Sequence, residues 1–196
     1  MTVNLTGDWA LTKKILTQAP TKIRRAYKQT LLREAHALRA EMIRGITKQA
    51  PGGAPFTTLS EVTLAIRKLK GFTGTKALIH RGDLRNAINV VIRGDEAFIG
   101  VPRKARKGKN KMIDVARVHE FGAGPFIVPK TRKMLQFLFV ALKKAGIKPQ
   151  GNGSKSGVFV MDIPARPFIR PVFAKYLKGR GKSFVQKLAN NLNLRG

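Results

Sequence analysis

The sequence predicts an α+β protein in which a small antiparallel sheet packs with a long N-terminal helix and flanking helices. The long helix is indicated by apolar residues at steps of three and four; these are Ile23, Tyr27, Leu31, Ala35, Leu38, Met42 and Ile46. The sheet is indicated by two apolar runs, residues 88–92 and 97–99, on either side of the turn-like Gly94-Asp95-Glu96. This pattern is typical of a β-hairpin. Helices that flank such a sheet define the α+β class.

The N-terminal helical region is expected in two pieces. Pro20 suits the first turn of a helix over residues 20–48, because its missing N–H would be unpaired there anyway. A separate, shorter helix is then expected over residues 9–18. Basic residues fall largely off the apolar stripe and give the long helix a basic outer face; they are Arg24, Arg25, Lys28, Arg33 and Arg44. After a break rich in Gly and Pro, Ser60 is expected to cap a short helix.

The segment that follows the hairpin is strongly basic. Six Lys and Arg residues lie around one glycine within residues 103–111, and this composition favours an exposed flexible loop. Residues 134–142 are almost wholly apolar, and periodicity alone leaves open whether they form a buried strand or a buried helix. A connector rich in Gly and Ser, residues 149–157, precedes a predicted strand at 158–163.

The C-terminal part is expected to be helical. Three prolines at 164, 167 and 171 indicate a rigid turn after the strand. A basic helix is predicted over residues 173–193, and Gly179-Arg180-Gly181 leaves an interruption open. We therefore divide the chain into three regions. They are a basic helical region at 1–50, an α+β core at 51–175 with a basic loop at 102–111 and a flexible connector at 147–157, and a basic C-terminal helix at 176–196.

Charge is the strongest feature of the composition. The 196 residues contain 39 Lys and Arg against 10 Asp and Glu, a formal net charge of +29, while the hydrophobic fraction of 43% is that of a folded chain. Such a charge opposes compaction, so a polyanion or an acidic partner is expected in the working state. No apolar run long enough for a membrane span and no signal peptide is evident, so we expect no membrane association and synthesis in a host cytoplasm.

The acidic residues argue against an enzyme, because metal-dependent phosphoryl chemistry needs converging carboxylates. The ten are scattered, and only Asp114 and Glu120 could approach each other. His119-Glu120 begins like a zinc-protease motif, but Ala123 stands where the second His is needed, so a packed or hydrogen-bonded His119 is expected. We therefore predict no catalytic residue, no metal site and no cofactor; a metal-dependent nuclease acting through Asp114 or Glu120 has little support.

Three glycine-containing motifs also have structural interpretations. Gly181-Lys182-Ser183 ends like a phosphate-binding loop, but Tyr176 replaces the first glycine of that motif. Residues 151–156 fall one glycine short of a dinucleotide fingerprint and have the composition of a linker. Arg81-Gly82-Asp83 is interpreted as a turn in which Asp83 caps the next segment.

Four stretches together resemble one protein family. They are Pro55-Phe56-Thr57-Thr58-Leu59-Ser60 with Thr63 and Arg67-Lys68, the segment from Ala77 to Ile88, Val118-His119-Glu120-Phe121-Gly122, and Ile163-Pro164-Ala165-Arg166-Pro167-Phe168-Ile169. In order and spacing they are similar to motifs of phage virion-morphogenesis and tail-completion proteins, from residue 55 to about residue 173. These proteins are small α+β components of the phage neck.

The resemblance implies a structural, non-enzymatic role. We expect a homo-oligomeric ring, a hexamer in preference to a dodecamer, that completes the tail and joins it to the DNA-filled head. The implied partners are the phage connector and the tail-tube or terminator proteins, with genomic double-stranded DNA nearby, and the implied location is the virion neck. The resemblance also favours a strand over a helix at residues 134–140. The alternative is a nucleic-acid-binding protein without sequence preference, of the nucleoid or ribosomal kind, which would explain the charge but not the four motifs.

Two sets of site residues follow. Contacts with DNA phosphates or with an acidic partner are expected from Arg103, Lys104, Arg106, Lys107, Lys109, Lys111, Lys178, Arg180 and Lys182. No base-reading motif accompanies them, so these contacts would be independent of DNA sequence. A subunit interface is expected at Phe121, Arg166 and Phe168, because Arg and aromatic residues are favoured at interface centres. The alternative for Phe168 is that it fills the core of its own subunit.

Overall fold

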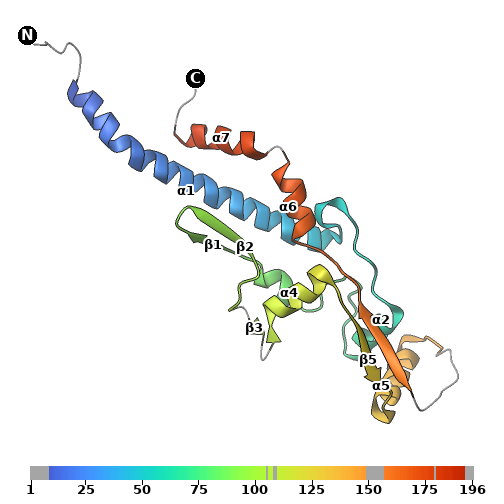
Figure 1. Ribbon diagram of the computed structural model, residues 1–196. Coiled ribbons are helices and arrows are strands. Elements are labelled where there is room, and N and C mark those ends of the chain that lie inside the picture. The colour runs from blue at the N-terminus through green and yellow to red at the C-terminus, as the bar shows by residue number, and fades with distance from the viewer. Residues whose placement is uncertain (1–8, 105, 108–109, 149–156, 179, 193–196) are drawn as a thin grey trace, which may run out of the picture.

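The computed structural model describes residues 9–104, 106–107, 110–148, 157–178 and 180–192 (Figure 1). It confirms the α+β class. Among these residues the chain order is α1 Trp9–Lys48, the short 3-10 helix η1 Pro51–Gly53, α2 Glu61–Leu69, α3 Asp83–Ala87, β1 Asn89–Arg93, β2 Glu96–Gly100, β3 Arg106–Lys107, β4 Asn110–Lys111, α4 Met112–Phe121, β5 Ala123–Pro129, α5 Arg132–Ala145, β6 Val158–Ile163, α6 Arg170–Leu177 and α7 Arg180–Asn191.

Helix α1 is a single helix of 40 residues, so the predicted division at Pro20 is wrong. Proline removes one backbone donor from a helix and often kinks it, but here the turns on both sides continue the helix. The apolar stripe is buried only in the C-terminal half of α1, where Met42 and Ile46 are fully buried. Ile23 is 49% exposed, and the N-terminal end of α1 extends beyond the rest of the fold (Figure 1).

The described strands form three separate two-stranded antiparallel ladders in place of one small sheet. The predicted hairpin is confirmed as β1 and β2, which pair from Asn89↔Gly100 to Arg93↔Glu96. Strands β5 and β6 pair with an irregularity between Ala123 and Phe126. The basic segment after the hairpin was expected as a loop, and its described residues instead include the short ladder of β3 with β4.

Residues 134–140 lie in helix α5, so the strand that the family resemblance favoured is wrong. The helix is capped at both ends. At its start the Thr131 side chain accepts from the Met134 N–H at 3.2 Å, and at its end Gly146 adopts a left-handed backbone conformation. Both residue types are standard helix caps. The apolar run packs one side against α2, where Ala141 is fully buried, and leaves the other side exposed.

The C-terminal helix is interrupted, as the glycines at 179 and 181 suggested. Helix α6 ends at Leu177 and α7 begins at Arg180. Helices α6 and α7 both make polar contacts with α1 (Figure 1): the Glu34 carboxylate of α1 accepts from the Tyr176 hydroxyl of α6 and from the Lys187 ammonium of α7. The connector predicted at 147–157 falls mostly outside the described residues.

The core lies between the C-terminal half of α1, the segment from α3 to β2, α4 and α6. Its buried members are Leu38, Met42, Ile46, Leu84, Ile88, Val101, Met112, Ala116, Phe168 and Val172. This core joins residues more than 120 positions apart in the sequence, and it places the end of α4 against the start of α6. That junction forms the site described next.

Candidate functional site

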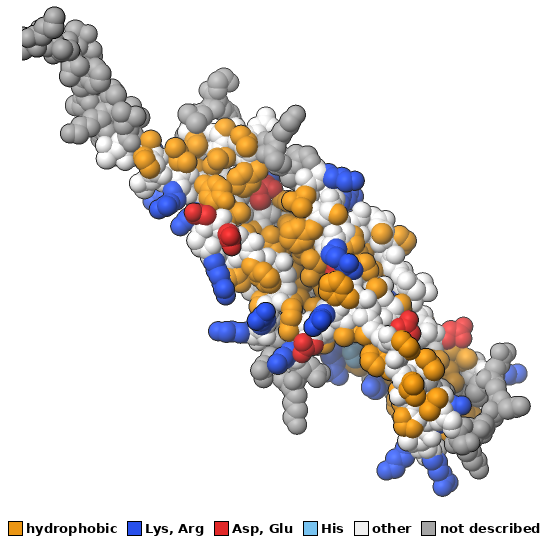
Figure 2. Space-filling view, viewed as in Figure 1, with side chains coloured by type: hydrophobic (Ala, Val, Ile, Leu, Met, Phe, Trp, Pro, Cys, Tyr) orange, Lys and Arg blue, Asp and Glu red, His pale blue; other side chains and the backbone are white. Residues whose placement is uncertain are grey.

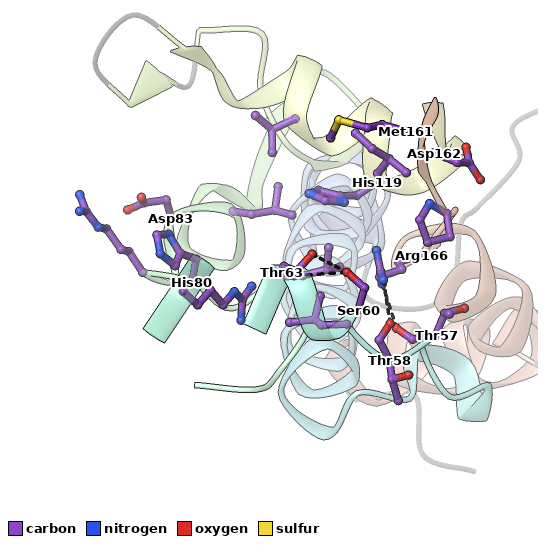
Figure 3. Close-up of a pocket in the computed structure, with 18 of the residues that line it drawn as sticks. Thr57, Thr58, Ser60, Thr63, His80, Asp83, His119, Met161, Asp162 and Arg166 are labelled. Atoms are coloured by element: carbon purple, nitrogen blue, oxygen red, sulfur yellow. Dashed lines mark hydrogen bonds between the residues drawn. The ribbon is translucent and has the colours of Figure 1, made fainter. Parts of the chain in front are cut away.

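The four family-like stretches converge on one pocket. The first supplies the N-terminus of α2, the second the turn before α3, the third the end of α4, and the fourth the chain between β6 and α6 (Figure 3). The cavity has a volume of about 630 Å³. Its polar lining comes from Thr57, Thr58, Ser60, Thr63, Arg67, His80, Arg81, Asp83, His119, Asp162 and Arg166.

Glu120 joins the third stretch to the fourth. Its buried carboxylate accepts the backbone N–H groups of Phe168, Ile169 and Arg170 at 2.8, 3.0 and 2.9 Å. These donors lie at the start of α6, whose N-cap residue, Ile169, makes no side-chain capping hydrogen bond. A carboxylate at a helix N-terminus satisfies unpaired donors and favours the helix dipole. Glu120 is therefore the cap of α6, supplied from a different helix.

Arg166 joins the fourth stretch to the first. Its guanidinium Nε donates to the Thr57 carbonyl at 2.9 Å, and a terminal nitrogen donates to the Thr58 carbonyl at 3.1 Å. Its backbone N–H donates to the His119 carbonyl at 2.7 Å. Arg166 is only 7% exposed, so these bonds form in a largely dry environment where they hold the chain before α2 against the end of α4.

Two local features shape the junction. Gly122 has a left-handed backbone with φ of +78°, and a Cβ at this position would lie 3.1 Å from the Ile163 carbonyl oxygen. Gly122 therefore forms a tight turn directly after Phe121. Ser60 is the N-cap of α2, as predicted, and accepts from the Thr63 N–H at 3.3 Å. The cap predicted at Asp83 is wrong: Gly82 is the N-cap of α3, and Asp83 is its first helical residue.

His119 lines the pocket as a packed side chain. Its Nδ1 is buried without a hydrogen-bond partner among the described residues. Burial, and then the positive charge of Arg166, hold the pKa of His119 below its ordinary value, so the neutral imidazole is favoured. Within the described part of the chain, no three His, Asp or Glu side chains gather as a metal site would require.

The predicted acid pair is not assembled as catalytic groups. Both Glu120 oxygens are occupied by N–H donors of residues 168–170, whereas Asp114 is exposed on α4. The His80 side chain is also exposed, and its ring lies 3.9 Å from the ring of Phe72. Burial and the nearby positive charges of Arg67, Arg81 and Lys70 lower the pKa of His80.

The predicted polyanion contacts occupy separate parts of the fold. Arg103, Lys104, Lys111 and Lys178 are exposed. Arg106, Lys107, Arg180 and Lys182 belong to β3 and α7, where only the backbone is described, and Lys109 lies outside the described residues. The β3–β4 segment and α7 are far apart in Figure 1. The described members of this set do not lie in one patch, and the role of the nine residues stays a prediction.

The predicted interface residues differ in exposure. Phe168 is fully buried and Arg166 nearly so, which agrees with the alternative that Phe168 fills its own core. Phe121 is 62% exposed, and the Arg170 guanidinium stacks 4.6 Å from its ring centre. The arrangement leaves Phe121 as the member of the three that is available to a neighbour, and its role there stays a prediction.

Sequence reasoning missed an exposed apolar surface, which we call the apolar ribbon. It consists of the two strands β5 and β6, with exposed residues Phe126, Ile127, Val158, Val160 and Met161. Figure 2 shows hydrophobic side chains gathered over this region. Helix α5 adds Phe137, Phe139 and Val140, all at least 40% exposed. The available signal was the lack of charge in residues 123–129 and 158–161 of so basic a chain.

The fold and the site define a basic α+β protein whose motif residues bind its own elements together around one pocket. The model of the phage virion morphogenesis family matches residues 8–188, and the chain belongs to that family. The protein thus has a structural role in phage virion assembly. It matches no curated protein and no solved structure. Within the described residues, no helix is long and apolar enough to cross a bilayer.

Proposed function

We propose that this protein is a non-enzymatic structural component of the phage neck, in which copies form a ring that completes the tail and joins it to the DNA-filled head. Membership of the virion morphogenesis family supports the assembly role. The ring and the position in the neck are our extension of that role. The observation that carries this extension is the apolar ribbon.

Exposed apolar side chains that lie side by side mark a candidate site of contact with another protein. Ile127 and Val160 are opposite each other in the ladder and are 72% and 68% exposed. Directly opposed side chains form a continuous surface, which is extended here by Val158. Burial against another protein would remove this surface from water, at about 25 cal/mol for each Å² of apolar area.

A second copy of the chain is the occupant that fits best. Two chains of net charge +29 repel each other, so their contact is least unfavourable where charge is absent. Residues 123–129 and 158–161 contain no charged residue. Each strand of the ribbon also has a single described ladder partner, which leaves the other edge available for pairing. A contact between two different faces, repeated around an axis, closes a ring.

The basic surface would then face DNA or acidic neighbours. Arg103, Lys104, Lys111 and Lys178 are exposed and can contact phosphates without reading sequence. A hexamer is favoured over a dodecamer. The proposed partners are the phage connector, the tail-tube or terminator proteins, and genomic double-stranded DNA at the neck.

Mass photometry of the purified protein in high and low salt, with and without duplex DNA, tests the proposal. The wild-type protein should give a discrete ring mass, alone or with connector or tail partners. Ile127→Asp should shift this mass to the monomer. Leu177→Asp is the matched control, because Leu177 is 66% exposed at the end of α6 and away from the ribbon. A ring that survives Ile127→Asp would contradict the proposed interface.

Nonspecific nucleic-acid binding remains a second candidate because of the +29 charge alone. It predicts a monomer that coats duplex DNA in proportion to DNA length, with binding that weakens steeply as salt rises. The same measurements separate the two functions, since only the neck protein gives a mass that is independent of DNA length.

A further inference from the structure

Two of the guanidinium groups that line the pocket, those of Arg67 and Arg166, have no carboxylate partner among the described residues. Arg67 donates to the carbonyls of Gly74 and Lys76 at 3.0 and 2.9 Å, and Arg166 donates to those of Thr57 and Thr58. All four acceptors are neutral backbone groups. Each guanidinium has five N–H donors, so both retain donors beyond these bonds.

Both cations are partly shielded from water, and Arg67 lies within the electrostatic influence of Arg166. The pKa of Arg67 is lowered first by burial and then by the positive charge of Arg166, and burial also lowers the pKa of Arg166. Positive charges that line one partly buried pocket favour the binding of an anion there. Figure 3 shows the carboxylates of Asp83 and Asp162 at opposite sides of the pocket, away from Arg166.

The rest of the pocket lining combines hydroxyl groups with apolar side chains, which restricts the chemistry of a ligand that would fit. Ser60 and Thr63 place hydroxyl groups at the N-terminus of α2, on the side of the pocket that holds Arg166 (Figure 3). That terminus adds the positive end of a nine-residue helix. Apolar walls face these groups and come from Leu59, Leu78, Leu84, Met112, Val115, Met161 and Ile163. The pocket thus combines an anion site with apolar surroundings.

We propose that this pocket binds a carboxylate side chain, together with an adjacent apolar side chain, from an acidic partner protein. A protein segment fits better than DNA, because duplex phosphates lie on a convex backbone between polar sugars, whereas a side chain can enter a cavity of about 630 Å³ with apolar walls. A second copy of this chain fits less well, because it has only 10 acidic residues against 39 basic ones. The proposal does not depend on ring formation.

Methionine methyl groups provide a probe of the pocket in the full-length protein. Of the five methionines, Met112 and Met161 line the pocket, whereas Met42 and Met134 do not. Protein with 13C-labelled methionine methyl groups is titrated with 4-methylpentanoate, which has a carboxylate and an apolar chain. The matched neutral probe is 4-methylpentan-1-ol. The third probe is inorganic phosphate, an anion without an apolar chain.

In NMR spectra, 4-methylpentanoate should shift the methyl signals of Met112 and Met161 until the shift saturates. The alcohol should need at least about tenfold higher concentration for the same shift, since charge-assisted hydrogen bonds are stronger than neutral ones. Equal response to the alcohol, tighter binding of phosphate, or equal shifts at Met42 and Met134 would each overturn the proposal. These comparisons on the wild-type protein need no variant.

A pair of variants with the same net charge then tests the cation. Arg67→Gln should weaken 4-methylpentanoate binding about tenfold, the loss expected when a charged hydrogen-bond donor is removed. Arg93→Gln removes an exposed positive charge from β1, outside the pocket lining, and should leave binding unchanged. Equal weakening by both variants would mean that only the general positive field attracts the probe, and would overturn the assignment.

Discussion

The Glu120 carboxylate accepts the backbone N–H of Phe168 at 2.8 Å, and this bond ties the end of α4 to the start of α6 across 48 residues of sequence. The same carboxylate accepts from Ile169 and Arg170. The Arg170 side chain also bonds to the backbone of Glu120: one of its terminal nitrogens donates to the Glu120 carbonyl at 2.9 Å. Two stretches that look like separate motifs in the sequence are thus the two halves of one structural junction. The contacts of Glu120 in this junction explain its place in the motif without a catalytic role.

Replacing Glu120 tests this interpretation. Glu120→Ala leaves three N–H donors at the start of α6 without their acceptor, and we expect a loss of about 3 kcal/mol in the free energy of unfolding. Urea unfolding followed by circular dichroism measures it. Glu96→Ala is the control, because Glu96 is exposed in the β1–β2 hairpin and its loss should change stability by less than about 0.5 kcal/mol. Equal stability of the two variants would contradict the capping role.

Adjacent glycines give a second test, at the contact between η1 and α6. Gly52 and Gly53 both have positive φ, +66° and +100°, but a Cβ on Gly52 would lie 2.6 Å from the Pro171 carbonyl oxygen, whereas one on Gly53 meets nothing within 4 Å. Gly53→Ala should cost only the backbone strain, about 1 kcal/mol. Gly52→Ala should cost about 3 kcal/mol or more, because backbone atoms must move. Thermal unfolding compares them; similar melting temperatures would show that η1 does not pack on α6 as described.

Local signals in the sequence predicted much of the fold. Ser60 marks the start of α2 and the Gly94-Asp95 turn marks the hairpin, because caps and turns depend on residues close in sequence. At α5 the caps Thr131 and Gly146 were equally visible, but the family resemblance favoured a strand and was wrong. Pro20 shows the opposite error: a local breaker was given more weight than the helical turns on both sides of it.

The site was harder to predict than the fold, because it depends on pairings between distant residues. Nothing near Glu120 in the sequence indicates that its partners are the N–H groups of residues 168–170. Arg166 was predicted as an interface residue from its type alone, and the structure shows its side chain bonded to Thr57 and Thr58 of the same chain. The apolar ribbon was missed because its strands, β5 and β6, are 28 residues apart and reveal a shared surface only when paired.

The stability of the protein should depend on pH through His119. Its pKa is lowered in the folded state, so the unfolded chain binds a proton more readily near the ordinary value of about 6.5. Stability should therefore be full above about pH 7 and fall as pH decreases through 6.5, by at most about 1.4 kcal/mol for each pH unit, until the folded-state pKa is passed.

A variant isolates the contribution of this histidine. His119→Gln should reduce the slope of unfolding free energy between pH 7 and pH 5, measured by urea unfolding at each pH. His80→Gln is the control, because its pKa is lowered in the same direction but its side chain is exposed, so the change in slope should be smaller. A larger effect from His80→Gln would mean that the buried imidazole is not the dominant pH-sensitive group in this range.

The salt dependence of DNA binding separates specific contacts from general charge. The triple variant Arg103→Gln, Lys104→Gln and Lys111→Gln removes exposed cations of the β3–β4 segment, and the control triple Lys133→Gln, Lys143→Gln and Lys144→Gln removes exposed cations of α5. Both chains have a net charge of 29 − 3 = +26, so their general attraction to DNA is the same.

If the β3–β4 segment contacts phosphates, the first triple should lower the slope of log K against log salt by about 2 to 3, since each lost phosphate contact contributes about 0.9. The control should keep the wild-type slope. Fluorescence anisotropy with a labelled duplex at several salt concentrations measures both slopes, and an equal decrease in the two would show that the β3–β4 residues are not contact residues.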